Sequence, residues 1–224
     1  MQTLKSDVLT VQVSDFGAEL QSIVKNGCEY LWQGNPAFWG RRSPVLFPIV
    51  GSVWEKKYRV SGKEYDMGQH GFARDSRFEL ILSSDSEAWY RLESSEETLA
   101  KYPWPFVLEI GYNLNRTELQ VLWKVINPGS EDMFFQIGAH PAFNYPGYSP
   151  ETADRGYVAF DKTEGLNRVG FKEKGCVDPE SVCPLILGRD GLLPVKNDTF
   201  PGGKIRLRNR RDAETYKIVQ VKEM

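Results

Sequence analysis

Alternation of apolar and polar residues is the dominant pattern along this chain. Near the amino terminus, Leu9, Val11 and Val13 alternate with polar residues, as expected for a strand with one buried face. Similar segments recur, and we expect strands at 77–82, 88–92, 106–113, 118–126, 134–138, 157–160, 185–187, 204–207 and 216–221. The pattern therefore favours a fold built almost entirely of strands.

Two dipeptides mark hairpin turns between strand-like segments. Asn26-Gly27 separates 19–24 from 28–32, and both residue types tolerate the positive φ of a type I′ turn. Ser61-Gly62 predicts a second hairpin between 58–60 and 63–67.

Segment 94–101 is the one that resembles a helix. Ser94 and Glu97 have the spacing of a capping box, and Pro103 would stop the helix within about two turns.

Many short strands joined by tight turns predict antiparallel sheets stacked in a sandwich. Parallel α/β folds are excluded because the crossover helices they require are missing. A chain of 224 residues buries a sizeable core without disulfides or metals. We therefore expect an all-β protein with little helix, forming a single β-sandwich domain over residues 1–224.

Composition narrows the range of partners and locations. The formal net charge of −2 argues against a nucleic-acid partner or an anionic membrane surface, because both need a net basic face. The chain has an odd number of cysteines without CxxC spacing, namely Cys28, Cys176 and Cys183. No apolar stretch approaches membrane-spanning length. These features predict a reduced, cytoplasmic protein, and nothing in the sequence favours a particular oligomeric state.

The chain has two histidines, and both lie in segments punctuated by glycine or proline. His70 stands in Gln69-His-Gly-Phe-Ala-Arg-Asp75, and His140 stands in Gly138-Ala-His-Pro-Ala-Phe-Asn144. A loop histidine is ordinarily a surface residue. Because sites concentrate in loops held by a rigid scaffold, a shared site containing both histidines is the competing hypothesis.

Several chemistries lack their sequence signatures. The chain contains no GxSxG, HxH, HExxH, CxxC or phosphate-cradling glycine motif. His70, His140 and an acid would formally suffice for a facial metal triad, but the tight His-x-Asp/Glu pair typical of such sites is missing. Metal-free acid–base chemistry on a small polar ligand remains, and imidazole, with an ordinary pKa near 6.5, suits it.

Arginine and aromatic side chains flank the two histidines. Arg42 and Arg74 offer forked donors to hydroxyl or phosphate oxygens. Segment 39–51 holds two prolines and cannot be a central strand, so we expect a buried loop or edge segment that carries Arg41 and Arg42. The aromatic residues near these motifs have two interpretations, packing in the core or forming a flat wall for a sugar ring. They are Trp32, Trp39, Trp54, Phe72 and Phe143.

Three motifs resemble those of the aldose 1-epimerase (galactose mutarotase-like) superfamily and occur in the same order. Within that superfamily, the sequence is most similar to the LacX-like branch. They are Trp39-Gly-x-x-Ser43-Pro-Val-Leu-Phe-Pro48, Gln69-His-Gly-Phe-Ala-Arg-Asp75 and Gly138-Ala-His-Pro-Ala-Phe-Asn144. The resemblance extends from about residue 7 to about residue 208. It implies a large antiparallel supersandwich with a sugar cleft on one concave sheet face, and a reaction that interconverts α and β anomers without a metal or organic cofactor.

The resemblance also implies roles for particular residues. His140 matches the acid that protonates the ring oxygen, and His70 matches the histidine that binds and polarises the sugar. Other matches are predicted to bind substrate: the cleft arginines Arg42 and Arg74, and the acidic residue Asp198 within Lys196-Asn-Asp-Thr199. Among the aromatic residues near the motifs, Phe72 is the one predicted to bind substrate.

The carboxyl-terminal segment departs from the family pattern. The family's general base is a glutamate in a late strand-edge motif, and neither Glu214 nor Glu223 stands in such a motif. We therefore expect a mutarotase shortened at its carboxyl end, and losing one acid–base partner removes a factor of about 10²–10⁴ in rate.

Three hypotheses follow for the function. The first is an aldose 1-epimerase acting on a hexose or hexose phosphate. The second is a carbohydrate-binding or sensory module without catalysis, and the third is a shortened product with little function of its own. Glucose, galactose and phosphorylated hexoses are all compatible with the residues present.

Overall fold

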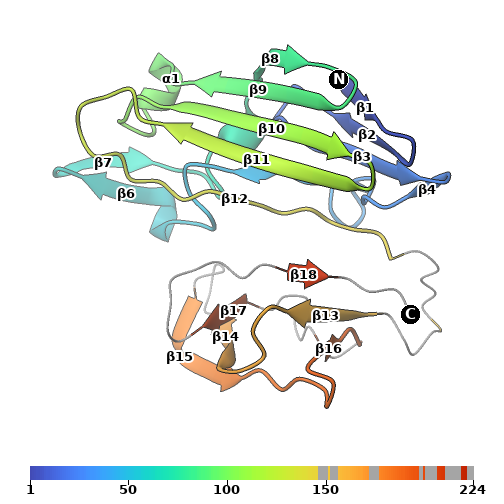
Figure 1. Ribbon diagram of the computed structural model, residues 1–224. Coiled ribbons are helices and arrows are strands. Elements are labelled where there is room, and N and C mark those ends of the chain that lie inside the picture. The colour runs from blue at the N-terminus through green and yellow to red at the C-terminus, as the bar shows by residue number, and fades with distance from the viewer. Residues whose placement is uncertain are drawn as a thin grey trace. The chain divides into compact units, whose positions relative to one another are not determined.

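The computed structural model describes residues 1–145, 151, 156–171, 177–196, 199, 206–209 and 218–220 (Figure 1). The chain divides into two compact units, Met1–Asn144 and Tyr145–Met224. The single domain expected over residues 1–224 stays a prediction.

The first unit contains two four-stranded antiparallel sheets. The first sheet has the order β1-β2-β3-β4, with strands β1 (Gln2–Lys5), β2 (Leu9–Val13), β3 (Leu20–Lys25) and β4 (Cys28–Glu29). The second has the order β11-β10-β9-β8, with strands β8 (Glu79–Ser83), β9 (Glu87–Glu93), β10 (Val107–Asn115) and β11 (Glu118–Ile126). The strands expected at 77–82, 88–92, 106–113 and 118–126 are therefore confirmed, with small shifts at their ends.

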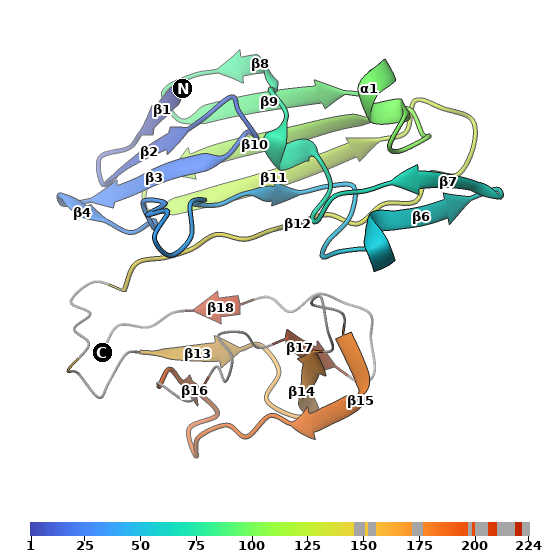
Figure 2. The ribbon, with the colours of Figure 1, turned by 180° about the vertical axis from the view of Figure 1, so that it is seen from behind.

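The two sheets form the layers of a sandwich with the main core between them, as the opposite views in Figures 1 and 2 show. In β2 the predicted alternation is confirmed, because Leu9, Val11 and Val13 are buried whereas the residues between them are half-buried. The facing sheet contributes alternate residues of β10 to the same core: Leu108, Ile110, Tyr112 and Leu114.

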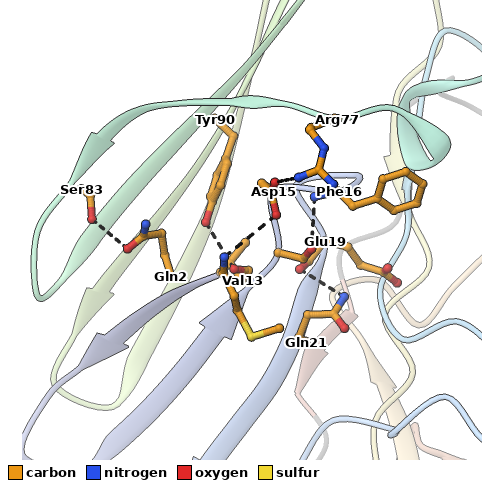
Figure 3. A network of polar contacts seen from close by, with 11 residues as sticks. Gln2, Val13, Asp15, Phe16, Glu19, Gln21, Arg77, Ser83 and Tyr90 are labelled. Carbon is orange, nitrogen blue, oxygen red and sulfur yellow. Dashed lines mark hydrogen bonds and ion pairs between the residues drawn. The ribbon is translucent and has the colours of Figure 1, made fainter.

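Polar contacts also link the two layers at one side of the sandwich (Figure 3). The Tyr90 hydroxyl of β9 donates to the carbonyl of Val13 in β2, at 3.3 Å. Ser83 of β8 donates to Gln2 of β1, at 3.1 Å. Each contact joins a strand of one sheet to a strand of the other, so hydrogen bonds as well as core packing connect the two sheets.

The two predicted hairpins are present. Asn26 and Gly27 both have positive φ between β3 and β4. Ser61 and Gly62 do so between β6 (Lys57–Val60) and β7 (Lys63–Asp66), which pair with each other. Turn chemistry that is local in sequence therefore predicted these connections correctly.

The helix expected at 94–101 is shorter than its pattern indicated. Helix α1 spans Glu96–Leu99, and its capping box joins Ser95 to Thr98 rather than Ser94 to Glu97. Two short 3₁₀ segments, η1 (Trp54–Lys56) and η2 (Ala73–Asp75), are the other helical turns among the described residues.

Segment 39–51 is buried at its centre, as predicted, and forms the short strand β5 (Val45–Leu46). β5 pairs with β12 (Gly138–Ala139). Of the strand expected at 134–138, only Gly138 lies in a strand, and residues 134–137 have no regular structure. Beyond β5, Phe47 bridges in parallel to Gly71. The segment therefore has one histidine motif on each side.

The second unit holds two three-stranded sheets among its described residues, with orders β16-β13-β18 and β15-β14-β17. The strands are β13 (Tyr157–Phe160), β14 (Leu166–Phe171), β15 (Val177–Pro184), β16 (Leu193–Pro194), β17 (Arg206–Asn209) and β18 (Ile218–Gln220). Phe160, Leu166 and Leu193 form its small core. Residues 185–187, expected as a strand, instead follow β15 without regular structure. No helix in the described part of either unit is both long and apolar enough to cross a membrane.

Candidate active site

His70 lies in a tight turn after β7 and is held by the backbone of Gly51. The His70 amide donates to the Gly51 carbonyl at 2.7 Å, and the Gly51 amide donates back to Nδ1 of the His70 ring at 2.9 Å. The residue is buried and has a φ of 65°. Because Nδ1 accepts a hydrogen bond, the neutral ring carries its proton on Nε2.

The glycine that follows His70 is required by the approach of segment 39–51. Gly71 has a positive φ, and a Cβ built there would overlap the carbonyl of Phe47. That same carbonyl accepts from the amides of Phe72 and Ala73, at 3.0 and 3.2 Å. The turn that presents His70 is therefore anchored directly on the residue after β5.

His140 lies just beyond β12, on the other side of segment 39–51. Its amide donates to the Pro44 carbonyl at 3.1 Å, and the Ala142 amide donates to the Arg42 carbonyl at 2.9 Å. Farther along, the side-chain amide of Asn144 donates to the carbonyls of Glu29 and Leu31. His140 is exposed, while the backbone on both sides of it is held by hydrogen bonds.

The two histidine rings meet. Their centroids are 4.7 Å apart, and their planes are at 81° to each other. His70 and His140 are far apart in the sequence and come together because both motifs pair with segment 39–51. The His70 imidazole is buried, with its Nδ1 accepting from a backbone amide, whereas the His140 side chain is exposed.

Arg74 is four residues beyond His70, and its side chain is 16% exposed. Its Nη2 donates to the Gln69 carbonyl at 2.8 Å. Its Nε forms an ion pair with Asp75 Oδ2 at 3.4 Å. This nitrogen is buried and has no hydrogen-bond partner among the described residues. Burial, and then the nearby Arg41 guanidinium, lowers the pKa of Arg74, though arginine remains charged at neutral pH. Arg41 itself pairs with Asp75 at 2.8 Å.

Arg42 is half-buried, and its side chain is hydrogen-bonded to the backbone of β3. Its Nη1 donates to the Gln21 carbonyl at 2.7 Å. Its amide and that of Ser43 both donate to the carboxylate of Glu19, at 3.0 and 2.8 Å. Glu19 stands outside all three sequence motifs, so sequence reasoning did not identify it. Only its contacts with the 42–43 backbone connect it to the site.

The predicted aromatic wall divides between core and surface. The half-buried ring of Phe72 packs against Phe47 and Phe106, with centroids 6.3 and 5.8 Å apart. Phe143, three residues beyond His140, is instead 61% exposed, and Trp54 is 62% exposed. Core packing thus accounts for Phe72, and the role of Phe72 in substrate binding stays a prediction.

Three acidic residues singled out in the sequence, Asp198, Glu214 and Glu223, lie outside the described residues. Within those described, no three histidine, cysteine, aspartate or glutamate side chains form a group that would hold a metal ion. The expectation of metal-free chemistry stays a prediction.

Comparison with known proteins identifies the class. The family model described as aldose 1-epimerase matches residues 1–168. The LacX protein of Lactococcus lactis subsp. lactis is 33% identical over 198 residues, covering 84% of this chain and 66% of LacX.

Solved structures agree with this match. A galactose mutarotase related enzyme from Lactobacillus acidophilus has a TM-score of 0.80 and 35% identity, over 88% of this chain and 65% of that enzyme. A galactose mutarotase-like protein from Lactobacillus casei ATCC 334 has a TM-score of 0.82 and 33% identity, over 92% of this chain and 71% of the other.

The chain belongs to the aldose 1-epimerase family and has the galactose mutarotase-like β-sandwich fold. Within that family it falls in the LacX-like branch. The chain spans about two thirds of the length of the relatives that it matches, 66% of LacX and 65% of the Lactobacillus acidophilus enzyme.

Proposed function

We propose that this protein is an aldose 1-epimerase that interconverts the α and β anomers of a hexose or hexose phosphate by metal-free acid–base catalysis. The observation that carries the proposal is the contact between the His70 and His140 rings, 4.7 Å between centroids. Membership of the aldose 1-epimerase family supports the same reaction class. The reaction needs no cofactor, and the proposed partner is the sugar alone.

The proposed reaction opens and recloses the sugar ring. A base removes the proton from O1 while His140 gives a proton to the ring oxygen, and the bond between C1 and the ring oxygen breaks. The open-chain aldehyde rotates about C1–C2. The ring oxygen then attacks the other face of C1, returning its proton to His140, and O1 regains a proton from the base. An imidazole suits this exchange because its ordinary pKa lies near neutral pH.

His70 has a different role in the proposal. Its Nδ1 accepts from the Gly51 amide, and in the proposal its Nε2–H donates to a sugar oxygen. Arg42 and Arg74 would bind hydroxyls or a phosphate through their forked donors. Their cationic charge is compatible with either substrate form.

The base remains unassigned among the described carboxylates. Glu19 and Asp75 contact candidate residues, but Glu19 already accepts two backbone amides. Asp75 is paired with Arg41 and Arg74. These existing contacts favour the alternative function, a carbohydrate-binding or sensory module without catalysis.

Anomer exchange measured by NMR saturation transfer distinguishes the two functions. For an enzyme, glucose or galactose exchanges faster with protein than without it. His140→Ala should reduce this excess rate by about 10²–10⁴. Lys101→Ala is the control, because its ammonium group pairs with Glu97 of helix α1, and it should match the wild type.

Each result has a definite meaning. Sugar resonances that broaden with the protein, without exchange above background, would replace the epimerase with the binding module. An unchanged excess rate in His140→Ala would remove His140 from the role of acid. Testing glucose 6-phosphate beside glucose then separates the two substrate forms.

A further inference from the structure

The turn between β2 and β3 contacts both of the segments that carry candidate arginines. On one side, the Gly17 amide donates to the Ser76 carbonyl, and the Phe78 amide donates to the Asp15 carbonyl, at 2.7 and 2.8 Å. Figure 3 shows this side of the turn, with Asp15 paired to Arg77. The turn is thereby attached to the chain just beyond Arg74.

On its other side, the turn holds the Arg42 segment through one side chain. Oε1 of Glu19 accepts from the amides of Arg42 and Ser43, at 3.0 and 2.8 Å. Hydrogen bonds to an ionised carboxylate are roughly twice as strong as those between neutral groups. Two adjacent amides directed at one oxygen also fix the orientation of the peptide between Arg42 and Ser43.

The carbonyls of this same short segment hold the His140 motif. The Arg42 carbonyl accepts from Ala142, and the Pro44 carbonyl accepts from His140. Residues 42–44 are therefore hydrogen-bonded to the Glu19 carboxylate through two amides and to the His140 motif through two carbonyls. The Arg42 guanidinium donates to the Gln21 carbonyl of β3, the strand that begins directly after Glu19.

We propose that Glu19 is a positioning residue that sets the placement of both Arg42 and His140 without touching the substrate. This inference rests on the proposed function for its kinetic consequences. Its structural consequence, the dependence of the His140 ring environment on the Glu19 carboxylate, is independent of catalysis.

The test compares Glu19→Ala and Glu19→Gln with the wild type. Glutamine keeps an oxygen for the amides but loses the charge, so it should retain more function than alanine and provides a second variant if alanine fails to fold. Asp15→Asn is the control, because it removes a charge from the same turn without contact to residues 42–44.

Two measurements are made on each variant. The first is the apparent KM for anomer exchange, expected to rise about tenfold in Glu19→Ala, the equivalent of one charge-assisted hydrogen bond. It should rise less in Glu19→Gln and stay unchanged in Asp15→Asn. The second is the set of His140 ring C–H resonances, assigned from their loss in His140→Ala, which should shift in both Glu19 variants only.

The two measurements keep this inference separate from the proposed function. If the wild type shows no exchange, the epimerase proposal fails and the His140 resonances alone decide the role of Glu19. Unshifted His140 resonances in folded Glu19→Ala or Glu19→Gln would overturn the inference, whatever the kinetics. An equal change in Asp15→Asn would also overturn it, since the effect would then belong to the turn as a whole.

Discussion

Gly71 lies against the backbone of Phe47 so closely that no side chain fits between them. The two residues bridge in parallel, and this contact fixes where the chain turns after His70. Segment 39–51 thus serves as a common support, because it contacts the His70 motif at Phe47 and the His140 motif along β5.

Gly71→Ala should therefore destabilise the fold severely. The methyl group would overlap the Phe47 carbonyl at a position with a φ of 72°. Overpacking together with a left-handed conformation predicts a loss of about 2–5 kcal/mol in the free energy of unfolding. Urea denaturation would measure it.

Gly62→Ala is the matched control for this substitution. Gly62 also has a positive φ, 79°, but nothing lies within 4 Å of the position of its Cβ. Only the conformational penalty of about 1–2 kcal/mol should remain. Equal losses in the two variants would show that the approach to Phe47 is unimportant.

The hydrogen bond from the Gly51 amide to His70 Nδ1 predicts different results for two substitutions of His70. His70→Ala leaves that amide without its acceptor, which should cost about 1–3 kcal/mol in unfolding free energy. His70→Asn supplies a side-chain acceptor and tolerates positive φ, so it should be closer to the wild type in stability.

Sugar affinity should fall in both His70 variants, because neither has the Nε2–H. Thermal unfolding and sugar titration by NMR would measure the two effects separately. Wild-type affinity in His70→Asn would contradict a role for Nε2–H in binding.

Arg74 and Arg77 offer a comparison of two arginines close in sequence. The Arg74 side chain is only 16% exposed, whereas the Arg77 side chain is 72% exposed and pairs with Asp15. We expect Arg74→Ala to weaken sugar binding by about tenfold or more, as for the loss of a charged hydrogen bond. Arg77→Ala should leave affinity unchanged. If both variants bind like the wild type, Arg74 is not a substrate clamp.

Glu109 in the middle of β10 predicts a dependence of stability on pH. Its carboxylate is 7% exposed and accepts from Arg91 at 2.7 Å and from Lys124 at 3.1 Å. Hydrogen bonds from Arg91 first, and then from Lys124, hold its pKa below the ordinary 4.5. A lowered pKa in the folded state stabilises the fold above the unfolded pKa, and this contribution is lost as pH falls through the folded value.

Glu109→Gln should accordingly lower the unfolding free energy at pH 7 by about 1–3 kcal/mol, and its difference from the wild type should shrink as the pH falls below about 4.5. Denaturation at several pH values would measure this. Glu93→Gln is the control: Glu93 is 63% exposed and 3.9 Å from Arg91, so it should change stability by less than about 0.5 kcal/mol. A difference for Glu109→Gln that stays constant down to pH 3 would contradict the pairing.

Much of the fold follows from patterns that are local in the sequence. Two-residue alternation predicted β2, whose Leu9, Val11 and Val13 are buried while the residues between them are half-buried, and strand-like segments predicted the four strands of the second sheet. Asn26-Gly27 and Ser61-Gly62 predicted their hairpins, because few residues accept positive φ. The cap of helix α1 was placed one residue early, since neighbouring serines both satisfy a capping pattern and only the observed backbone selects Ser95.

The sequence by itself also determined which residues were candidates for chemistry, since His70, His140, Arg42 and Arg74 stand out by type and motif. Only the tertiary structure decided that the two histidine rings are in contact, that the ring of Phe72 packs in the core, and that Glu19 holds residues 42 and 43. These are contacts between segments distant in the chain. Their geometry depends on strand register and on how the β5 segment packs between the two motifs, which no local pattern encodes.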